Sequence, residues 1–294
     1  SARQKGFDTA KYEYIVLCDD DNWLDENFVQ TTYDIMSSND QIGILGGPNE
    51  ALCELDPPDW FKWFQQGYAA GQQADLNTGK VIEGNITWKR GFVWGAGMIV
   101  RRTALKELYA KGFKSIMSDR KGTQLSSGGD SELCFALVLS GWQVWYDSRL
   151  KLKHCMPAGR VSWDYLIRLF QGFGITSVGL DCYEKAIKAG RADIGQDEIN
   201  KLNWKYEYKK SLGEVKKYGY KKLLSLRFPQ ENRTDIPMLE YHLARLIELQ
   251  RVKDEYDRNI EAVKNAQWRI NSKELKASHR KFIETENDFR YGWP

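Results

Sequence analysis

Short apolar runs alternate with amphipathic segments along the first half of the chain. Continuous apolar runs are typical of buried strands, and apolar positions three and four residues apart are typical of helices that cover a sheet. Residues 1–156 interleave the two kinds of segment, which predicts an α/β domain with a helix-covered sheet. The predicted strands are 13–18, 42–46, 92–100 and 143–147, and the predicted helices are 25–37, 59–66, 102–111 and 130–140. A Gly-Gly-Pro-Asn break at 46–49 predicts a loop.

The second half of the chain, residues 157–294, reads as helix after helix with few strand signals. Residues 201–227 carry nine basic side chains against two acidic ones, Glu207 and Glu214, with aromatic residues interleaved. Two interpretations stay open for this stretch: an amphipathic surface that seeks an interface, or a solvated helix whose aromatic residues face the core. Further on, the spacing of apolar residues predicts one long polar helix over 238–286.

Composition narrows the possible function classes. The 294 residues hold 43 basic and 40 acidic side chains, a net charge of +3, so no overall field points to a nucleic-acid partner. The five cysteines form no Cys-x-x-Cys pair, which argues against a disulfide framework or a zinc cluster and favours a reducing compartment such as the cytoplasm. No apolar run approaches the length of a membrane span, so we expect any membrane contact to be peripheral.

Three consecutive aspartates, Asp19, Asp20 and Asp21, follow the apolar run at 14–18. Because this run does not alternate, we expect a buried strand whose end presents the carboxylates together. Like charges so close need a positive partner, and a hard divalent cation such as Mn²⁺ or Mg²⁺ binds carboxylate and diphosphate oxygens alike. The alternative is an acidic turn in which Asp21 and Asn22 cap the following helix.

Two further features carry chemistry. Gly128 and Gly129 precede Asp130 at the start of a predicted helix, where a ligand can approach the backbone closely and the helix dipole favours a carboxylate. The alternative is that Asp130 is an N-cap, which is compatible with catalysis because a cap also fixes its position.

His154 follows the strand predicted at 143–147. It is either a structural residue or, with the upstream aspartates, a ligand of Mn²⁺ or Mg²⁺ whose coordination sphere is completed by diphosphate oxygens.

The order of these blocks resembles that of the family 2 glycosyltransferases. Segment 2–7 together with 14–21 is similar to the stretch that leads into the DxD motif of that family, and 94–102 is similar to the strand under its acceptor site. Residues 128–133 resemble its Gly-Glu-Asp-x-Asp/Glu-Leu block, and His154 stands where many members place a metal-binding histidine. Four blocks in the same order make the resemblance specific.

The resemblance implies a GT-A fold, which is a mixed sheet with helices on both faces. It also implies inverting transfer of a sugar from a nucleotide-diphosphate donor, first of all a UDP-sugar, to a glycan or lipid-linked acceptor. At the matching positions it implies Asp130 as the general base and Asp21 as the main metal ligand. The other implied site residues are Arg3, Asp19 and Asp20 for the donor, Asp19 and His154 for the metal, and Trp94, Gly95, Gly128, Gly129 and Glu132 for the acceptor.

The chain departs from the family pattern in two places. Gly129 stands where the family usually has glutamate, so the role of that carboxylate is absent or displaced. The family also opens with nucleotide-binding strands that we do not find, so we expect residues 1–156 to be a partial domain. Residues 156–174 resemble the C-terminal segments of bacterial polysaccharide-assembly members. Arg160 and Arg168 are therefore either contacts of the diphosphate or of a lipid-linked acceptor, or ordinary surface arginines.

Three functions compete on the sequence. The leading hypothesis is an inverting, metal-dependent hexosyltransferase of polysaccharide biosynthesis, located in the cytoplasm or at the inner face of the cell membrane. The alternative is an inactive, truncated interaction or membrane-surface module, which the expected loss of the first strands and the basic stretch 201–227 motivate. A third hypothesis, a nucleotidyltransferase, would require a glycine-rich phosphate loop bearing Lys or Arg, which this chain does not show.

Overall fold

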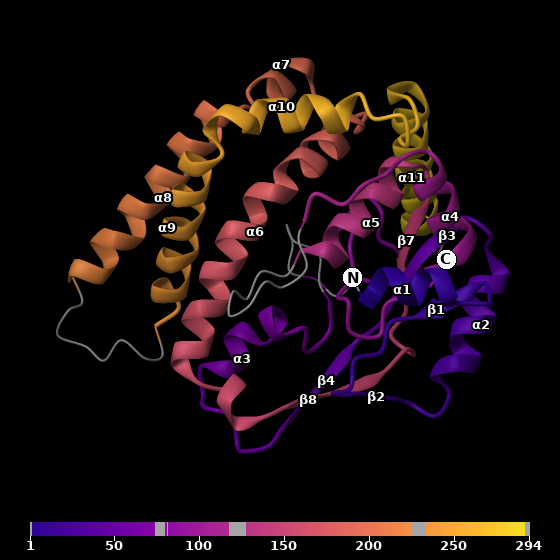
Figure 1. Cartoon of the computed structure of the whole chain (residues 1–294), viewed down its shortest axis with the longest axis horizontal. Coiled ribbons are helices and arrows are strands. Elements are labelled where there is room, and N and C mark those ends of the chain that lie inside the picture. The colour runs from indigo at the N-terminus through magenta and orange to yellow at the C-terminus, as the bar shows by residue number, and fades with distance from the viewer. Residues whose placement is uncertain (1, 74–79, 81, 118–127, 225–232, 292–294) are drawn as a thin grey trace.

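The computed structural model describes residues 2–73, 80, 82–117, 128–224 and 233–291. An α/β region with two mixed sheets comes first, and a set of helices follows it (Figure 1). The predicted α/β class, with a helical C-terminal region, is therefore confirmed.

The larger sheet has five strands in the order β1-β6-β3-β7-β5. Strands β3 and β7 are parallel, and β6 runs antiparallel to both β1 and β3. The carboxyl ends of β1, β3 and β7 consequently meet at one edge of the sheet, which is where open α/β sheets bind ligands. The strands are β1 (Tyr14–Val16), β3 (Ile42–Gly46), β5 (Gly84–Asn85), β6 (Ile99–Arg101) and β7 (Gln143–Tyr146).

The smaller sheet has three strands in the order β2-β8-β4. It consists of β2 (Asn22–Leu24), β4 (Asn49–Cys53) and β8 (Leu152–Met156), with β8 antiparallel to β2 and parallel to β4. The link from β3 to β4 is tight because a Cβ atom on Gly47 would lie 2.0 Å from the carbonyl oxygen of Leu150. The predicted loop at 46–49 is therefore shorter than expected, since β4 already begins at Asn49.

Helices cover both faces of the larger sheet. On one face Leu45 and Ile99 pack against α2 (Phe28–Ser38), and on the other Ile44, Val100 and Val144 face the core that holds α4 (Arg102–Ala110) and α5 (Gly129–Leu139). The alternation along each strand follows from the two-residue period of a β-strand, which sends successive side chains to opposite faces. The predicted helices at 25–37, 102–111 and 130–140 correspond to these three helices.

Several details of the predicted pattern were wrong. The run at 14–18 is not a buried strand, because β1 lies at the edge of the sheet, where residues 14–17 are half-buried and Cys18 is exposed. The strand predicted at 92–100 begins only at Ile99, because Gly97, with φ +72°, turns the chain just before it. The helix predicted at 59–66 is short and continues as a 3₁₀ turn: α3 (Phe61–Phe64) and η1 (Gln65–Tyr68).

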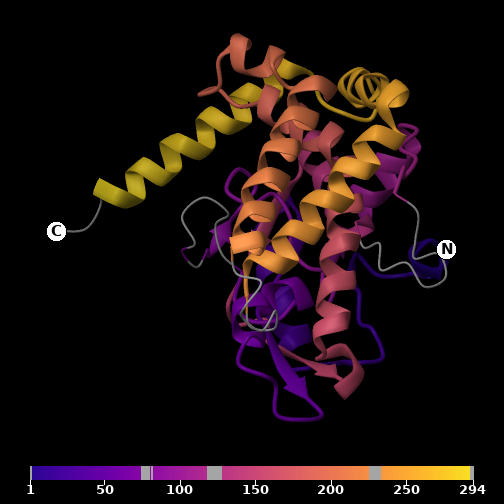
Figure 2. The same cartoon turned by 90° about the vertical axis from the view of Figure 1, so that its left-hand side faces the viewer.

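The helical region packs on the α/β region as well as on itself (Figures 1 and 2). Helix α6 (Trp163–Ala189) contacts both α5 and α9 (Asp235–Arg251), and α8 (Trp204–Leu224) packs on the outer side of α9. One hydrophobic core continues from the sheet into this region. The predicted boundary between two domains at residue 156 therefore has no separate core on each side, and it stays a prediction. The remaining helices are α1 (Ala2–Thr9), α7 (Gln196–Asn200), α10 (Lys253–Lys264) and α11 (Ser272–Tyr291), with a 3₁₀ turn η2 (Ala158–Arg160).

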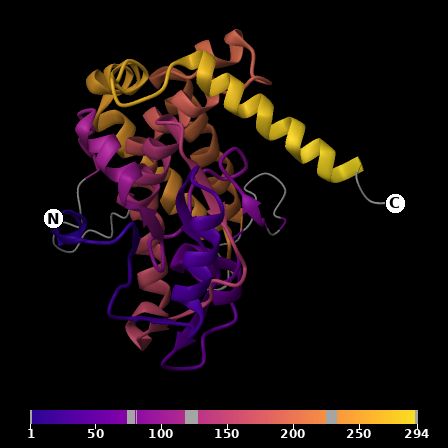
Figure 3. The ribbon, with the colours of Figure 1, turned by 90° about the vertical axis from the view of Figure 1, so that its right-hand side faces the viewer.

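The single helix predicted over 238–286 was wrong. The chain breaks at Val252, between α9 and α10, and again at 265–271, after which α11 projects away from the body (Figure 3). Among the described helices, none combines the length and the apolar character that crossing a bilayer requires.

Candidate active site

The start of the aspartate run lies at the edge of the larger sheet where β1 ends. Beyond β1, the backbone of Leu17 pairs with the segment that enters β6: Leu17 N–H donates to the Met98 carbonyl at 2.8 Å, and Gly97 N–H donates to the Leu17 carbonyl at 3.0 Å. This pairing holds the start of the aspartate run beside residues 94–98. The DxD segment and the predicted acceptor segment therefore share one end of the sheet.

Asp130 reaches the same edge from the first turn of α5. It lies directly over Gly95, where an added Cβ atom would stand 2.1 Å from Asp130 Oδ2, so a larger residue at 95 would displace the carboxylate. The helix begins at Gly129 with Gly128 as N-cap and no side-chain capping bond. The N-cap alternative for Asp130 was therefore wrong, and the first-turn position still places its carboxylate where the helix dipole favours negative charge.

Arg3, from α1, pairs with Asp130 at a distance of 2.5 Å between Nη2 and Oδ1. Both side chains remain about one-third exposed, so a ligand can reach the pair. Arg3 was expected to contact the donor, and in this structure it instead partners the predicted base. Its role toward the donor stays a prediction.

Asp21 and His154 come together across the smaller sheet, although they lie far apart in the sequence. In the β2–β8 register Asn22 faces His154, and Cys155 N–H donates to the Asp21 carbonyl at 2.8 Å. As a result His154 Nε2 lies 3.6 Å from Asp21 Oδ2. Arg160 Nη1 approaches the same carboxylate oxygen at 2.8 Å. The structure thus brings together the two residues expected to form the core of the metal site, with an arginine beside them.

Asn22 fixes the aspartate run, a role that sequence reasoning missed. It is buried, and its amide donates to Asp21 Oδ1 at 2.9 Å while its Oδ1 accepts from Asp19 N–H at 3.3 Å. Asn22 begins β2, and α2 starts only at Phe28 after the uncapped Asn27, so the interpretation of Asp21 and Asn22 as helix caps was wrong. The available signal was an amide residue directly after three aspartates.

Asp19 and Asp20 are exposed at the tip of this turn, whereas Asp21 is half-buried. Among the described contacts, the carboxylates of Asp19 and Asp20 take part in no hydrogen bond or ion pair. The charge of Asp19 nevertheless acts on the neighbouring Cys18. Partial burial and then the charges of Asp19 and Asp21 raise the pKa of the Cys18 thiol. The turn therefore presents negative potential to solvent.

Glu132 lies in the interior rather than at the edge. It is 1 % exposed, and its carboxylate accepts hydrogen bonds from Ile116 N–H at 2.7 Å, from the Tyr183 hydroxyl at 2.7 Å and, by a shorter contact, from the Ser115 hydroxyl. These contacts anchor the segment at 115–117 to α5 and α6. Glu132 was expected to contact the acceptor, and its position in the structure supports a role in holding that segment instead.

The other predicted acceptor residues lie around Asp130. Trp94 is half-buried, with the Arg90 guanidinium 5.7 Å from its ring centroid. Gly128 is packed closely, since a Cβ atom there would meet Thr176 at 2.5 Å, and Gly129 lies beside Arg3. The glycines therefore serve close packing around the start of α5.

The donor atoms fit a hard divalent cation that is held mainly by a substrate. In the described part of the chain no three His, Cys, Asp or Glu residues converge closely enough to enclose a metal ion. Asp21 and His154 supply one carboxylate and one imidazole instead. Mg²⁺-type sites commonly take one or two protein ligands and complete their shell with substrate phosphates and water. The pair thus fits such an ion, with Arg160 beside it as a competing cation.

Open α/β sheets bind ligands in the crevice outside the carboxyl ends of their strands, and in this protein acidic residues follow β1 at that position. Residues 1–109 match the model of glycosyl transferase family 2. The resemblance to the family 2 glycosyltransferases is therefore confirmed for residues 1–109, and the mixed α/β sheets of the protein agree with a GT-A-like fold. A comparison with curated proteins found no match.

Proposed function

We propose that the protein is an inverting, metal-dependent glycosyltransferase. It moves a hexosyl group from a nucleotide-diphosphate donor to a hydroxyl of a glycan or lipid-linked acceptor in polysaccharide biosynthesis, in the cytoplasm or at the inner face of the membrane. One observation carries the proposal. The Asp21 carboxylate, within the family 2 match at residues 1–109, lies 3.6 Å from His154 Nε2, and Asp130 lies over Gly95 of the same matched stretch.

The donor, with a UDP-sugar as the first choice, binds over the aspartate turn. Asp21 and His154 would hold Mn²⁺ or Mg²⁺, with Asp19 close by, and a bound ion would supply neutralisation of the charge on the leaving diphosphate. Arg160 holds the Asp21 carboxylate while the donor is absent. When the diphosphate arrives, the Arg160 guanidinium turns to it, because a diphosphate offers more negative charge than one carboxylate.

Asp130 acts as the general base of a single displacement. The acceptor oxygen bonds to the anomeric carbon as the bond from that carbon to the diphosphate breaks. The bonding electron pair leaves with the diphosphate, and the acceptor proton passes to Asp130. Attack from the face opposite the leaving group inverts the anomeric configuration. Arg3 holds Asp130 in position between turnovers. General-base catalysis of this kind contributes roughly 10²–10⁴-fold to the rate.

The acceptor lies against Trp94 and Gly95, beside Asp130. The half-buried indole offers an apolar face for a sugar ring, and Gly95 leaves room for the carboxylate above it. Gly128 and Gly129 keep the start of α5 free of side chains next to Asp130. Glu132 is left out of the acceptor site because its carboxylate is already occupied in the interior.

Calorimetric titration of the full chain with UDP-, GDP- and dTDP-sugars, with and without Mn²⁺, tests the proposal. We expect one nucleotide to bind only when Mn²⁺ is present and Asp21→Ala to lose this binding. The matched variant Asp164→Ala removes an exposed aspartate from α6 and should bind normally. Metal-independent binding in both variants would contradict the metal site. Absence of binding from a folded protein in every arm would favour the inactive module.

A further inference from the structure

Helix α8 presents a face of lysines to solvent. Six exposed lysines lie on this side, and we call them the lysine face: Lys205, Lys209, Lys210, Lys216, Lys217 and Lys221. Two exposed tyrosines, Tyr206 and Tyr220, lie among them, at 43 % and 67 % exposure. The chain as a whole has a net charge of only +3, so this single helix concentrates positive charge locally.

The opposite side of α8 fixes this orientation. The Trp204 indole N–H donates to the Leu249 carbonyl at 2.7 Å, and the Trp204 ring stacks on Tyr208 with centroids 4.9 Å apart. Glu207 and Ser211 are buried against α9 and α6. Helix α9 lies between α8 and α6, so the lysine face points away from the body (Figures 1 and 2). Trp204 and Tyr208 therefore face the interior, whereas Tyr206 and Tyr220 face solvent on the same side as the lysines.

The helix neutralises only a small part of its own outer face. Its two acidic residues are already engaged: Glu207 accepts a hydrogen bond from Arg245 in the interior, and Glu214 pairs with Lys217 at 2.8 Å. The lysine face therefore carries an excess of positive charge over the length of α8. An excess of this kind is complementary to an extended anionic surface.

We propose that the lysine face docks the protein on a membrane surface rich in anionic lipid. The charged residues are all lysines, and lysine is a point charge suited to diffuse attraction, whereas arginine favours bidentate recognition of individual phosphates. Tyrosine rings settle readily at the level of lipid headgroups, and a helix face that points away from the body can meet a flat partner. The proposal does not depend on catalysis, and it would bring the domain to a lipid-linked acceptor.

Vesicle sedimentation of the full chain tests the proposal. Vesicles of phosphatidylcholine alone are compared with vesicles that contain about one-third phosphatidylglycerol, at about 0.1 M and about 0.5 M NaCl. We expect binding only to the anionic vesicles at the lower salt. Since each lysine near such a surface contributes about 1 kcal/mol, the triple variant Lys205→Gln, Lys209→Gln, Lys216→Gln should bind about 100-fold more weakly.

A matched variant separates the lysine face from overall charge. Lys264→Gln, Lys273→Gln, Lys281→Gln removes three exposed lysines from α10 and α11 and should keep most of the binding. Equal losses in the two triple variants would overturn the proposal, as would equal binding to neutral vesicles. Binding to heparin or RNA without binding to vesicles would also overturn it, in favour of a soluble polyanion. Asp21→Ala should bind vesicles normally, so failure here is distinct from failure of the proposed transferase.

Discussion

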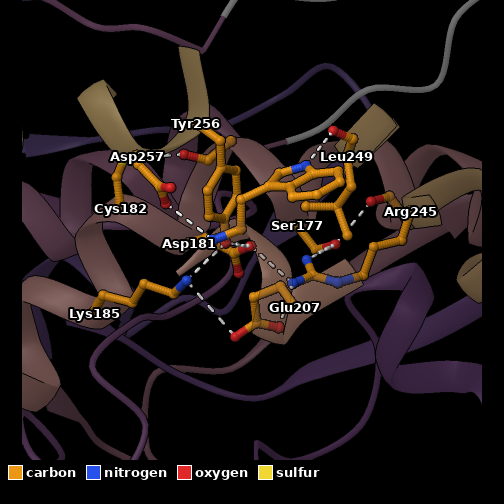
Figure 4. Close-up of polar contacts among 12 residues, drawn as sticks. Ser177, Asp181, Cys182, Lys185, Glu207, Arg245, Leu249, Tyr256 and Asp257 are labelled. Carbon is orange, nitrogen blue, oxygen red and sulfur yellow. Dashed lines mark hydrogen bonds and ion pairs between the residues drawn. The ribbon is translucent and has the colours of Figure 1, made fainter. Parts of the chain in front are cut away.

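Two clusters of charged side chains differ in how their charges are balanced. We call the cluster at the sheet edge the open cluster, and the cluster inside the helical region the closed cluster. At the edge, Asp19 and Asp20 are exposed and have no partner among the described contacts, and the Arg3–Asp130 pair stays about one-third exposed. In the helical region, Asp181 and Arg245 are paired at 2.8 Å and are both less than one-tenth exposed (Figure 4). The open cluster has carboxylates that can still bind a ligand, whereas the charged groups of the closed cluster are paired with one another.

The buried cluster is a closed network. Arg245 donates to Asp181 at 2.8 Å, to Glu207 at 3.0 Å and to the Ser177 hydroxyl at 2.8 Å. Tyr256 donates to Asp181 and accepts from Lys185 Nζ at 2.8 Å. The members come from α6, α8, α9 and α10, so the network fixes how four helices meet. This is a structural role, although a polar cavity of about 170 Å³ adjoins the network.

Burial and charge act against each other in this network. Burial alone would lower the pKa of Arg245, but the neighbouring carboxylates, Asp181 first, outweigh it and hold that pKa above its ordinary value. Burial lowers the pKa of Lys185, and the same carboxylates offset only part of that shift. Buried ion pairs of this kind contribute little net stability, yet removing one partner is costly because the other charge stays buried. A cluster of charged groups therefore indicates a ligand site when its charges are exposed and not paired within the protein.

The largest expected effect comes from a substitution in the open cluster. Asp130→Asn should lower the rate of sugar transfer roughly 10²–10⁴-fold, because the amide cannot accept the acceptor proton. Stability should change by less than about 1 kcal/mol, since the lost ion pair with Arg3 is partly exposed. Transfer rates and thermal unfolding of the same samples measure both quantities.

Asp164→Asn is the matched control for this variant. Asp164 also lies in the first turn of a helix, α6, and is exposed. Its replacement should leave the transfer rate within about twofold of the original, because no reacting group is removed. If Asp130→Asn transfers sugar as fast as this control, Asp130 is not the base.

The next largest effect comes from a substitution in the closed cluster. Arg245→Met should lower the free energy of unfolding by about 3–5 kcal/mol, because Asp181 and Glu207 would stay buried after losing their ion pairs with Arg245. Arg251→Met, on the same helix α9, breaks an exposed pair with Glu248 and should cost less than about 1 kcal/mol. Urea unfolding of both variants measures the difference. Similar values for the two would show that the buried network does not hold the helices together.

Part of the open cluster was predictable from the sequence. Asp21 and His154 were chosen from residue type and from their place after predicted strands, and Asp130 from its place at the start of a predicted helix. The structure places Asp21 Oδ2 3.6 Å from His154 Nε2 and Asp130 over Gly95, and the roles of the three residues stay predictions. Their mutual arrangement was not predictable. Asp21 reaches His154 only through the β2–β8 pairing, and both of these short strands lack a hydrophobic pattern of their own. Glu132 was misplaced because its burial depends on hydrogen bonds from 115–117, which no local pattern encodes.

The helical region was less predictable, because its breaks come from packing. The stretch 238–286 contains neither glycine nor proline, yet the chain leaves the helix at 265–271. There Ile270 N–H donates to the Leu139 carbonyl at 2.9 Å, and the Ser140 hydroxyl donates to the Trp268 carbonyl at 2.8 Å. The C-terminal end of α5 thus holds this segment out of the helix. Such contacts between distant segments leave no trace in local periodicity.

The smallest expected effect concerns the seam between the two regions, where α11 meets the α/β core. His279 is 2 % exposed, its Nδ1 accepts from Ala192 N–H at 3.0 Å, and its ring lies edge-on to Trp88. Burial lowers the pKa of His279. The unfolded chain therefore binds more protons than the folded one between the lowered pKa and the ordinary value near 6.5, so stability falls as the pH falls through this window.

Thermal unfolding at about pH 7.5 and about pH 5 measures this effect. We expect a loss on the order of 1 kcal/mol at the lower pH, about the value of the hydrogen bond from Ala192 that a protonated Nδ1 cannot accept. Asp193 does not share the window, because Arg191 lowers its pKa to about 2. His279→Gln keeps an acceptor for Ala192 without a titratable ring and should flatten the pH dependence. An unchanged slope in this variant would assign the effect to other groups, first to His242, whose pKa burial also lowers.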